Sequence, residues 1–274
     1  DTFKYYHHIE PRLSARYRIN PSNSIKASYS QNYQYVHLAS TAAVSLPTDL
    51  WVPSSEIIKP KFSTQYAIGY FKNFNDDMFE TSIELYYKDM ENLIEYKEGV
   101  LPEDNTNTNS DDAFTFGDGI SYGAEMLVRK NIGKTTGWIG YTISKTTRYF
   151  DEVNNGEPFP AKYDRRHDLS ITATHNLTKS WDLSGVFVYA TGNSITLPSQ
   201  RYVIDGNVFT EYTSRNGFRM EPYHRLDIGA TYTPKKKKRF TSSWNFSIYN
   251  VYNRKNPYFI YFALEENTDG NNGS

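Results

Sequence analysis

The sequence has no cysteine, no long apolar run and almost no net charge. Without cysteine, the chain can hold neither a disulfide framework nor a thiolate metal site. No stretch reaches the roughly 18 consecutive apolar residues that a membrane-spanning helix requires. The formal net charge of -1 provides no general attraction to nucleic acid. These absences exclude a disulfide scaffold, a helical membrane protein and a strongly basic nucleic-acid-binding domain.

Apolar residues are scarce as well, but aromatic residues are not. Hydrophobic residues make up 38% of the 274 residues and the mean hydropathy is -0.68, which is low for an ordinary core of this size. The chain nevertheless has 24 Tyr and 16 Phe. A disordered chain lacks such aromatics, whereas Tyr, with an apolar ring and a polar tip, suits a boundary between lipid and water.

Residues 137–189 show a repeating period of two. Ile139, Tyr141 and Ile143 alternate with small polar residues, and two further runs in this stretch repeat the alternation. This period is typical of β-strands with one apolar face. The opposite face is rich in Ser, Thr, Gly and charged residues, which predicts a membrane β-barrel with an apolar outside and a hydrated inside.

The same period predicts a series of strands joined alternately by short turns and long connections. The predicted strands span residues 8–19, 24–35, 62–72, 79–96, 120–131, 137–146, 168–174, 181–189, 223–233 and 240–251, followed by an apolar patch at 258–264. The long connections are 36–61, 98–118, 151–164 and 191–222. Short periplasmic turns alternate with long extracellular loops in outer-membrane barrels. We therefore predict an all-β fold, a transmembrane antiparallel up-and-down β-barrel, with about 10 or 11 strands in this chain.

The predicted barrel is incomplete. Bacterial single-chain barrels have even strand numbers, and an unclosed edge in lipid leaves unpaired backbone groups that each cost on the order of several kcal/mol. We expect residues 1–264 to be the C-terminal part of a barrel and residues 265–274 to be a polar tail or extracellular loop. A plug and the first half of the barrel would then belong to chain outside this sequence.

Two sets of residues are candidates for contact with a ligand or with material inside the barrel. If the apolar faces meet lipid, the charged residues between them line the lumen: Arg12, Arg16, Glu80, Glu84 and Glu125. Loops carry recognition, and the candidates in or beside the long connections are Trp51, Tyr149, Phe159, Tyr163, Arg165, Tyr202, Arg215 and Phe218. The aromatic members of the second set fit an interface girdle equally well.

The residues provide little support for catalysis. His167 and Asp168 resemble a base and its orienting carboxylate, but neighbours in a strand point to opposite faces and cannot form a simple dyad. We expect instead that Asp164 pairs with Arg165 or Arg166 at the rim of the barrel. The sequence predicts no enzyme, no metal site and no cofactor.

Several short motifs, taken in their order along the chain, resemble one known family. They include Tyr-Asp-Arg-Arg-His-Asp at 163–168 and Tyr-Asn-Val-Tyr-Asn-Arg-Lys-Asn-Pro at 249–257. The others lie at 9–17, 34–38, 46–53, 122–125, 189–193, 215–219 and 223–227. Together they are similar to the C-terminal half of a TonB-dependent outer-membrane receptor of the Bacteroidota type.

The resemblance implies a barrel of about 22 strands whose lumen is filled by an N-terminal plug domain. It implies active uptake of a scarce ligand across the bacterial outer membrane. The implied partners are outer-membrane lipid, the protein's own plug, the TonB complex acting through that plug and, more remotely, a surface lipoprotein. The ligand stays open between an iron chelate, cobalamin, a peptide and a sugar. The alternatives are a passive porin, an outer-membrane hydrolase with carboxylates at its rim, and a soluble β-sheet protein.

Overall fold

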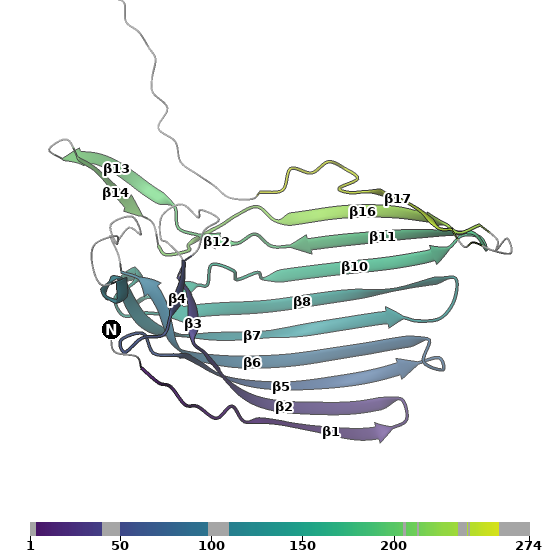
Figure 1. Cartoon of the computed structure of the whole chain (residues 1–274), viewed down its shortest axis with the longest axis horizontal. Helices are drawn as coiled ribbons and strands as arrows, with labels where there is room; N and C mark the ends of the chain where they lie inside the picture. The colour runs from purple at the N-terminus through teal and green to yellow at the C-terminus, as the bar shows by residue number, and fades with distance from the viewer. Residues whose placement is uncertain are drawn as a thin grey trace, which may run out of the picture.

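The computed structural model describes residues 4–39, 50–97, 110–204, 207–212, 214–234, 240 and 242–257. In these residues the chain forms one antiparallel eleven-stranded sheet whose neighbours follow the order of the sequence (Figure 1). Its strands are β1 (Arg12–Asn20), β2 (Asn23–Gln34), β5 (Lys61–Phe74), β6 (Phe79–Tyr96), β7 (Phe114–Lys130), β8 (Thr135–Tyr149), β10 (His167–Asn176), β11 (Trp181–Ala190), β16 (Tyr223–Tyr232) and β17 (Trp244–Ile248), with the two-residue β9 (Phe159–Pro160) beside β8. The predicted all-β, up-and-down order is confirmed.

The long connections contain short strands and 3-10 turns of their own, which the period-two pattern does not predict. These are the strand pairs β3 (Val36–Ala39) with β4 (Leu50–Pro53), β12 (Ser194–Ile195) with β15 (Phe218–Arg219), and β13 (Pro198–Ile204) with β14 (Asn207–Tyr212), and the 3-10 turns η2 (Ser110–Ala113) and η3 (Asn154–Gly156). All of these pairs lie toward the end of the sheet opposite the short turns (Figure 1). No helix among the described residues is long and apolar enough to cross a membrane.

Strand ends differ from the predicted ones for identifiable reasons. β1 begins at Arg12 and not at residue 8, because Pro11 has no N–H to add to the ladder. β17 ends at Ile248, shortly before Asn250, whose φ of 52° does not fit a strand. The predicted apolar patch at 258–264 lies outside the described residues.

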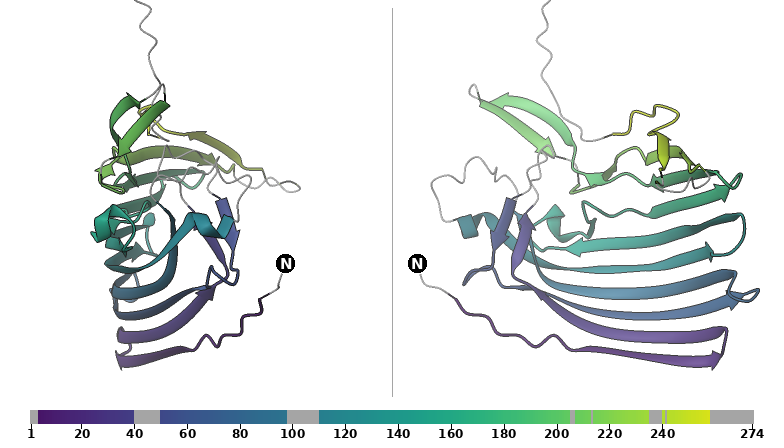
Figure 2. Two further views of the ribbon diagram at one scale, coloured as in Figure 1. Left: turned by 90° about the vertical axis from the view of Figure 1, so that its left-hand side faces the viewer. Right: turned by 45° about the vertical axis from the view of Figure 1, so that its right-hand side comes forward.

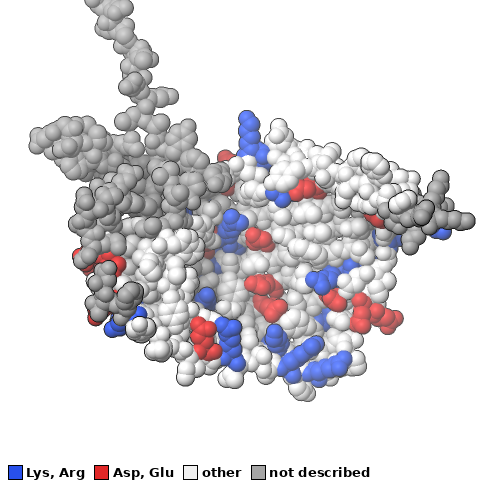
Figure 3. Space-filling view, in the orientation of Figure 1, with Lys and Arg blue, Asp and Glu red and all other residues white. Residues whose placement is uncertain are grey.

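The sheet curls into a trough that does not close, with β1 and β17 at its two edges (Figure 2). Charged side chains lie over the strands on the concave face, which Figure 3 shows from the front. The apolar side chains of the alternation occupy the convex face and are the more exposed set: Ile68, Leu85 and Ile139 are 53%, 51% and 48% exposed. This arrangement agrees with the predicted facing, and a lipid surface is the environment in which such a face is stable.

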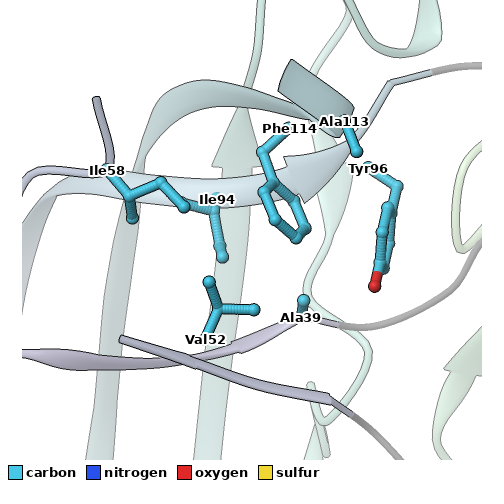
Figure 4. Close-up of a cluster of buried hydrophobic side chains, with 7 residues drawn as sticks. All are labelled: Ala39, Val52, Ile58, Ile94, Tyr96, Ala113 and Phe114. Atoms are coloured by element: carbon cyan, nitrogen blue, oxygen red, sulfur yellow. The ribbon is translucent and has the colours of Figure 1, made fainter. Parts of the chain in front are cut away.

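Buried apolar side chains gather at the loop-bearing end and not along the trough. One cluster joins Ala39 of β3 and Val52 of β4 to Ile94, Tyr96 and Phe114 at the ends of β6 and β7 (Figure 4). A second cluster consists of Leu93, Phe150, Val153 and Phe159, with Met90 packed against it. The two clusters fix the β3–β4 hairpin and the third long connection onto the sheet.

A β-bulge separates the trough from this end. The register between β6 and β7 shifts between Met90 and Leu93, and Asn92 has a positive φ of 57°. Before the bulge, Lys88 and Met90 lie on the concave face; after it, Leu93 and Glu95 occupy that face, opposite Gly117 and Thr115 of β7. Bulges of this type commonly re-aim side chains near functional sites.

Candidate functional site

One row of concave-face side chains crosses six neighbouring strands and the edge strand β1 at matched register. Its members, in spatial order, are Arg16, Lys26, Gly69, Glu84, Glu125, Thr142 and Asp168. The row therefore begins with two cations at the β1 edge and reaches three carboxylates in the centre of the sheet. Side chains in a strand alternate between the two faces, and the register between these strands is unbroken. All members of the row therefore lie on one face.

The three carboxylates, Glu84, Glu125 and Asp168, line a shallow hollow on the concave face together with Ser82 and Ser170. Within the described part of the chain, none of the three forms an ion pair or a hydrogen bond. Glu84 and Glu125 are directly opposite each other, an arrangement that destabilises a sheet when both are charged and nothing offsets them.

Gly69 opens the side of this hollow. A Cβ atom at position 69 would lie 2.7 Å from Cγ of Glu84, so any larger residue would displace the carboxylate side chain. Three carboxylates without a partner, in a hollow that a glycine keeps open, can receive a cationic side chain.

The structure places all five predicted lumen residues on the concave face. Three of them already have partners within the chain: Arg12 bonds to Glu10 and Asn32 at 3.1 Å each, Arg16 donates to Oγ of Ser24 at 3.2 Å, and Glu80 pairs with Arg129 at 3.6 Å. Glu84 and Glu125 have no partner among the residues that the structure describes. Contact of any of them with a plug stays a prediction.

Asp164 joins two long connections at the rim. Its side chain is 2% exposed, accepts the backbone N–H of Thr146 at 2.7 Å, and forms a 2.6 Å ion pair with Arg219 of the fourth connection. Of the two predicted partners, Arg166 forms a longer ion pair with Asp164 at 3.9 Å, which confirms that alternative, whereas Arg165 donates to Oδ1 of Asn193 at 3.3 Å. The pairing with Arg165 is therefore wrong, because the nearest cation comes from a segment 55 residues along the chain.

Arg215 makes a second connection of this kind. It is 6% exposed, and its guanidinium donates to the carbonyl oxygen of Tyr96 at 2.8 Å and lies 3.9 Å from the carboxylate of Glu95. Its backbone N–H donates to Oδ1 of Asn154 at 3.0 Å. Glu95 is also in close contact with the guanidinium of Arg148 on β8. The fourth connection is thus held to β6 and to the third connection, and Glu95 also links β6 to β8.

The predicted loop residues divide into exposed and buried groups. Trp51, Tyr163 and Phe218 are 61%, 54% and 43% exposed, and Tyr149 and Arg165 are also exposed; contact of these five with a ligand stays a prediction. Phe159 and Arg215 are buried and support the rim from within. The side chain of Tyr202 lies outside the described residues.

His167 and Asp168 do not come together. His167 lies on the convex face, where Nδ1 is 2.7 Å from the hydroxyl of Tyr141, whereas Asp168 lines the concave hollow. This agrees with the predicted divergence of neighbouring strand residues. Among the described residues, no group of three or more His, Asp or Glu side chains is arranged to hold a metal ion.

A group of cations near the rim was not predicted as a site. Lys61 of β5 is close enough to Lys88 and Arg148 for their charges to act on it, and Glu95 is the one carboxylate that acts in the opposite sense. In the sequence, the one sign of Lys61 and Lys88 is their position in the period-two alternation, which places both on the concave face. Arg148 and Glu95 are brought there by the bulge and by a contact between residues 53 positions apart.

Comparison with known proteins identifies the architecture. Residues 1–253 match the family model described as TonB-dependent receptor-like, β-barrel. No curated protein sequence matches the chain. Among solved structures, the ferripyoverdine receptor of the Pseudomonas aeruginosa outer membrane matches 89% of this chain and 29% of its own, with a TM-score of 0.59 and 18% identity.

Two further structures give the same result. The ferric-catecholate import receptor Fiu of Escherichia coli has a TM-score of 0.56 and 17% identity over 89% of this chain and 30% of its own. The FrpB iron transporter of Neisseria meningitidis has a TM-score of 0.55 and 13% identity over 89% of this chain and 35% of its own. At these identities the likeness establishes the fold, and the chain spans about a third of the length of each structure. Neither comparison bears on the Bacteroidota-type label, which stays a prediction.

Proposed function

Because the chain belongs to the TonB-dependent receptor-like β-barrel family, we propose that it forms wall and outer loops of a transporter that takes up a scarce ligand with energy from TonB. Receptors of this family are outer-membrane β-barrels with a plug domain, and they interact with TonB. The observation that carries the proposal is the family match over residues 1–253, on a sheet whose strands follow the sequence in up-and-down order.

The concave face has a place for a positively charged side chain of a plug. Glu84, Glu125 and Asp168 lie together without cations among the described residues, and a plug side chain with a positive charge would offset them. We assign this hollow to the plug and expect it to receive an Arg or Lys of that domain. The exposed loop residues Trp51 and Tyr163 would then meet the ligand outside the plug.

The ligand class to test first is a ferric chelate. The similar structures are named for ferripyoverdine, for ferric catecholates and for iron. Cobalamin, a peptide and a sugar are the other classes, and a surface lipoprotein over the loops would favour the larger ligands among them.

Uptake measured in whole cells tests the proposal. Cells that lack the full-length protein, and the same cells with the gene restored, would be grown on a panel of ferric chelates under iron limitation and on cobalamin, peptides and glycans. We expect growth on one class to require both the protein and an active TonB. Uptake that continues after TonB is removed would contradict active transport and favour a passive porin.

Bilayer conductance separates the two directly. The purified full-length protein should show no steady conductance in a planar bilayer, because a plug fills the lumen. Steady open-channel current from the intact protein would reject the plugged transporter.

A further inference from the structure

Two lysines lie on the convex face of the sheet near the short turns. The alternation that places Ile68 of β5 and Val128 of β7 on the convex face places Lys72 and Lys130 there as well. Within the described residues, neither ammonium group forms a hydrogen bond or an ion pair. A cation on the lipid face of a barrel is costly at the middle of the bilayer and costs little near its surfaces. We therefore expect both lysines at the level of the lipid headgroups.

The two ammonium groups lie over a pair of neighbouring rings. Phe74 of β5 and Phe79 of β6 are directly opposite each other, and Phe79 is in turn opposite Lys130. Nζ of Lys72 lies 4.5 Å from the centre of the Phe74 ring, and Nζ of Lys130 lies 5.7 Å from the centre of the Phe79 ring. Cross-strand partners have Cβ atoms about 4.5–5.5 Å apart, so the two cations share one platform of two rings. Such contacts attract a cation to the ring face without using its hydrogen bonds to an anion.

Neighbouring residues place this platform at the boundary between lipid and water. Tyr70, two residues before Lys72 on the same face, donates its hydroxyl to Oδ1 of Asn23 at 2.6 Å, and Asn23 begins β2 beside a short turn. An apolar ring with its polar tip directed toward water is typical of this boundary. A Cβ atom at Gly133, in the turn after β7, would lie 3.8 Å from Nζ of Lys130. The ammonium groups thus lie between the apolar wall and the short turns, which share one end of the sheet (Figure 1).

The protein does not offset this positive charge with carboxylates. On the convex face of β5 to β8, the acidic side chains of the described residues lie at the opposite, loop-bearing end: Asp89, Glu91 and Asp118. The turn between β5 and β6 contains Asp76 and Asp77, but neither forms an ion pair within the described part of the chain, and Asp77 accepts a hydrogen bond from the Asn73 amide at 2.7 Å. Two cations that face lipid without a carboxylate favour an anion supplied by the membrane.

We propose that Lys72 and Lys130 form a binding site for the headgroup phosphate of an anionic phospholipid in the periplasm-facing leaflet of the outer membrane. The ammonium groups donate to the phosphate oxygens, and the acyl chains lie along the apolar convex wall. Phe74 and Phe79 are positioning residues, because their rings hold the ammonium groups at the level of the phosphate. The site goes beyond the proposed transport function, since it belongs to the outer wall and not to the lumen or the loops.

Competition between two lipids tests the site. The purified full-length protein in detergent would be mixed with phosphatidylglycerol and phosphatidylcholine of identical acyl chains, and the bound lipids would be counted by native mass spectrometry. Phosphatidylcholine carries its own cation beside the phosphate, so we expect the first bound lipid to be phosphatidylglycerol with a preference of at least about fivefold. The double variant Lys72→Gln with Lys130→Gln should lose this preference, and Lys72→Arg with Lys130→Arg should keep it. Equal binding of the two lipids by the wild type overturns the site.

A matched control separates a defined site from general attraction to a basic surface. Lys134→Gln with Lys179→Gln removes the same charge from two exposed lysines of the short turns. This variant should keep the preference for phosphatidylglycerol, because neither lysine lies over the Phe74–Phe79 platform. Equal loss in the two double variants would show general attraction and overturn the site. Heat-modifiable mobility in gels verifies that every variant has folded.

Inorganic phosphate distinguishes a lipid site from a site for a free anion. Phosphate in large excess should leave phosphatidylglycerol bound to the wild type, because the acyl chains contribute much of the affinity. Displacement of the lipid by phosphate alone would show a simple anion site and overturn the assignment to a phospholipid. The readout is lipid binding and not uptake, so its failure is distinct from a failure of the transport function.

Discussion

The trough and its loop-bearing end are built on different principles. Along the trough, cross-strand partners stay in register, the apolar side chains are exposed on the convex face, and few side chains are buried. At the loop-bearing end, the register shifts at the bulge, two apolar clusters are buried, and Asp164 and Glu95 join segments far apart in sequence. Among the described residues, the buried apolar clusters belong to the loop-bearing end, so the end carries its own core and the trough does not.

The largest effect should come from removing a charge at the loop-bearing end. Glu95→Gln leaves the guanidinium groups of Arg148 and Arg215 without their carboxylate, and breaking a buried pair of this kind costs about 3–5 kcal/mol. The measurement is the free energy of unfolding of the full-length receptor in detergent, with protease digestion of the loops as a local readout.

Glu80→Gln is the control for this variant in the trough. The Glu80–Arg129 pair is 3.6 Å long and both side chains are more than 40% exposed, so its loss should cost at most about 1 kcal/mol. A loss as large as that of Glu95→Gln would erase the contrast between the two regions.

The next effect tests which face of the trough meets lipid. Ile139→Lys places a charge on the convex face and should cost about 2–4 kcal/mol near the middle of the bilayer. Thr142→Lys adds the same charge on the concave face between Glu125 and Asp168, where it should be nearly neutral or stabilising. Unfolding of both variants in lipid vesicles measures the difference, and equal costs would contradict the assigned facing.

A smaller effect should separate two glycines. A Cβ atom at Gly117, near the bulge, would overlap the Tyr149 carbonyl oxygen and lie 2.5 Å from the Phe150 ring, so Gly117→Ala should cost about 1–3 kcal/mol by overpacking. At Gly185, in the trough, the nearest atom would be 3.9 Å away, so Gly185→Ala should leave the unfolding midpoint almost unchanged. The reverse order would show that the loop-bearing end is the looser of the two regions.

The smallest effect is a pH dependence at the β3–β4 hairpin. Burial, with the charge of Lys61 as a second cause, lowers the pKa of His37 below its ordinary value of 6.5. The unfolded hairpin therefore binds a proton before the folded one does, so the contribution of His37 to stability is complete above pH 6.5 and is lost as the pH falls below that value. Protease cleavage in the hairpin should increase over this range, and His37→Asn should remove the dependence. Cleavage that increases with rising pH would show the wrong sign.

The trough could be predicted from the sequence because its information is local. A period of two assigns Ile139 and Ile171 to one face and Glu84 and Glu125 to the other, and alternating turn lengths determine the strand order. The divergence of His167 from Asp168 follows from the same period. The family resemblance extended this local information to the whole chain.

The loop-bearing end could not be predicted in the same way, because its contacts join distant residues. Arg215 reaches the Tyr96 carbonyl from 119 residues away, and Arg219 reaches Asp164 from 55 residues away. No period relates such positions, and a loop aromatic such as Phe159 gives no sign in sequence that it will be buried. The ligand, the domain limits and the loop contacts with ligand stay predictions for the same reason.

The bulge at Asn92 shifts the alternation of β6, so the residues that face the lumen have different parity in the trough and at the loop-bearing end. Up to Met90, even-numbered residues of β6 look into the lumen; after the extra residue, odd-numbered Leu93 and Glu95 do so. If the alternation of β6 ran unbroken through Asn92, the Glu95 side chain would point out toward lipid and the Ile94 side chain would point into the lumen. One extra residue is therefore enough to give a barrel of this kind a different mouth on an unchanged wall.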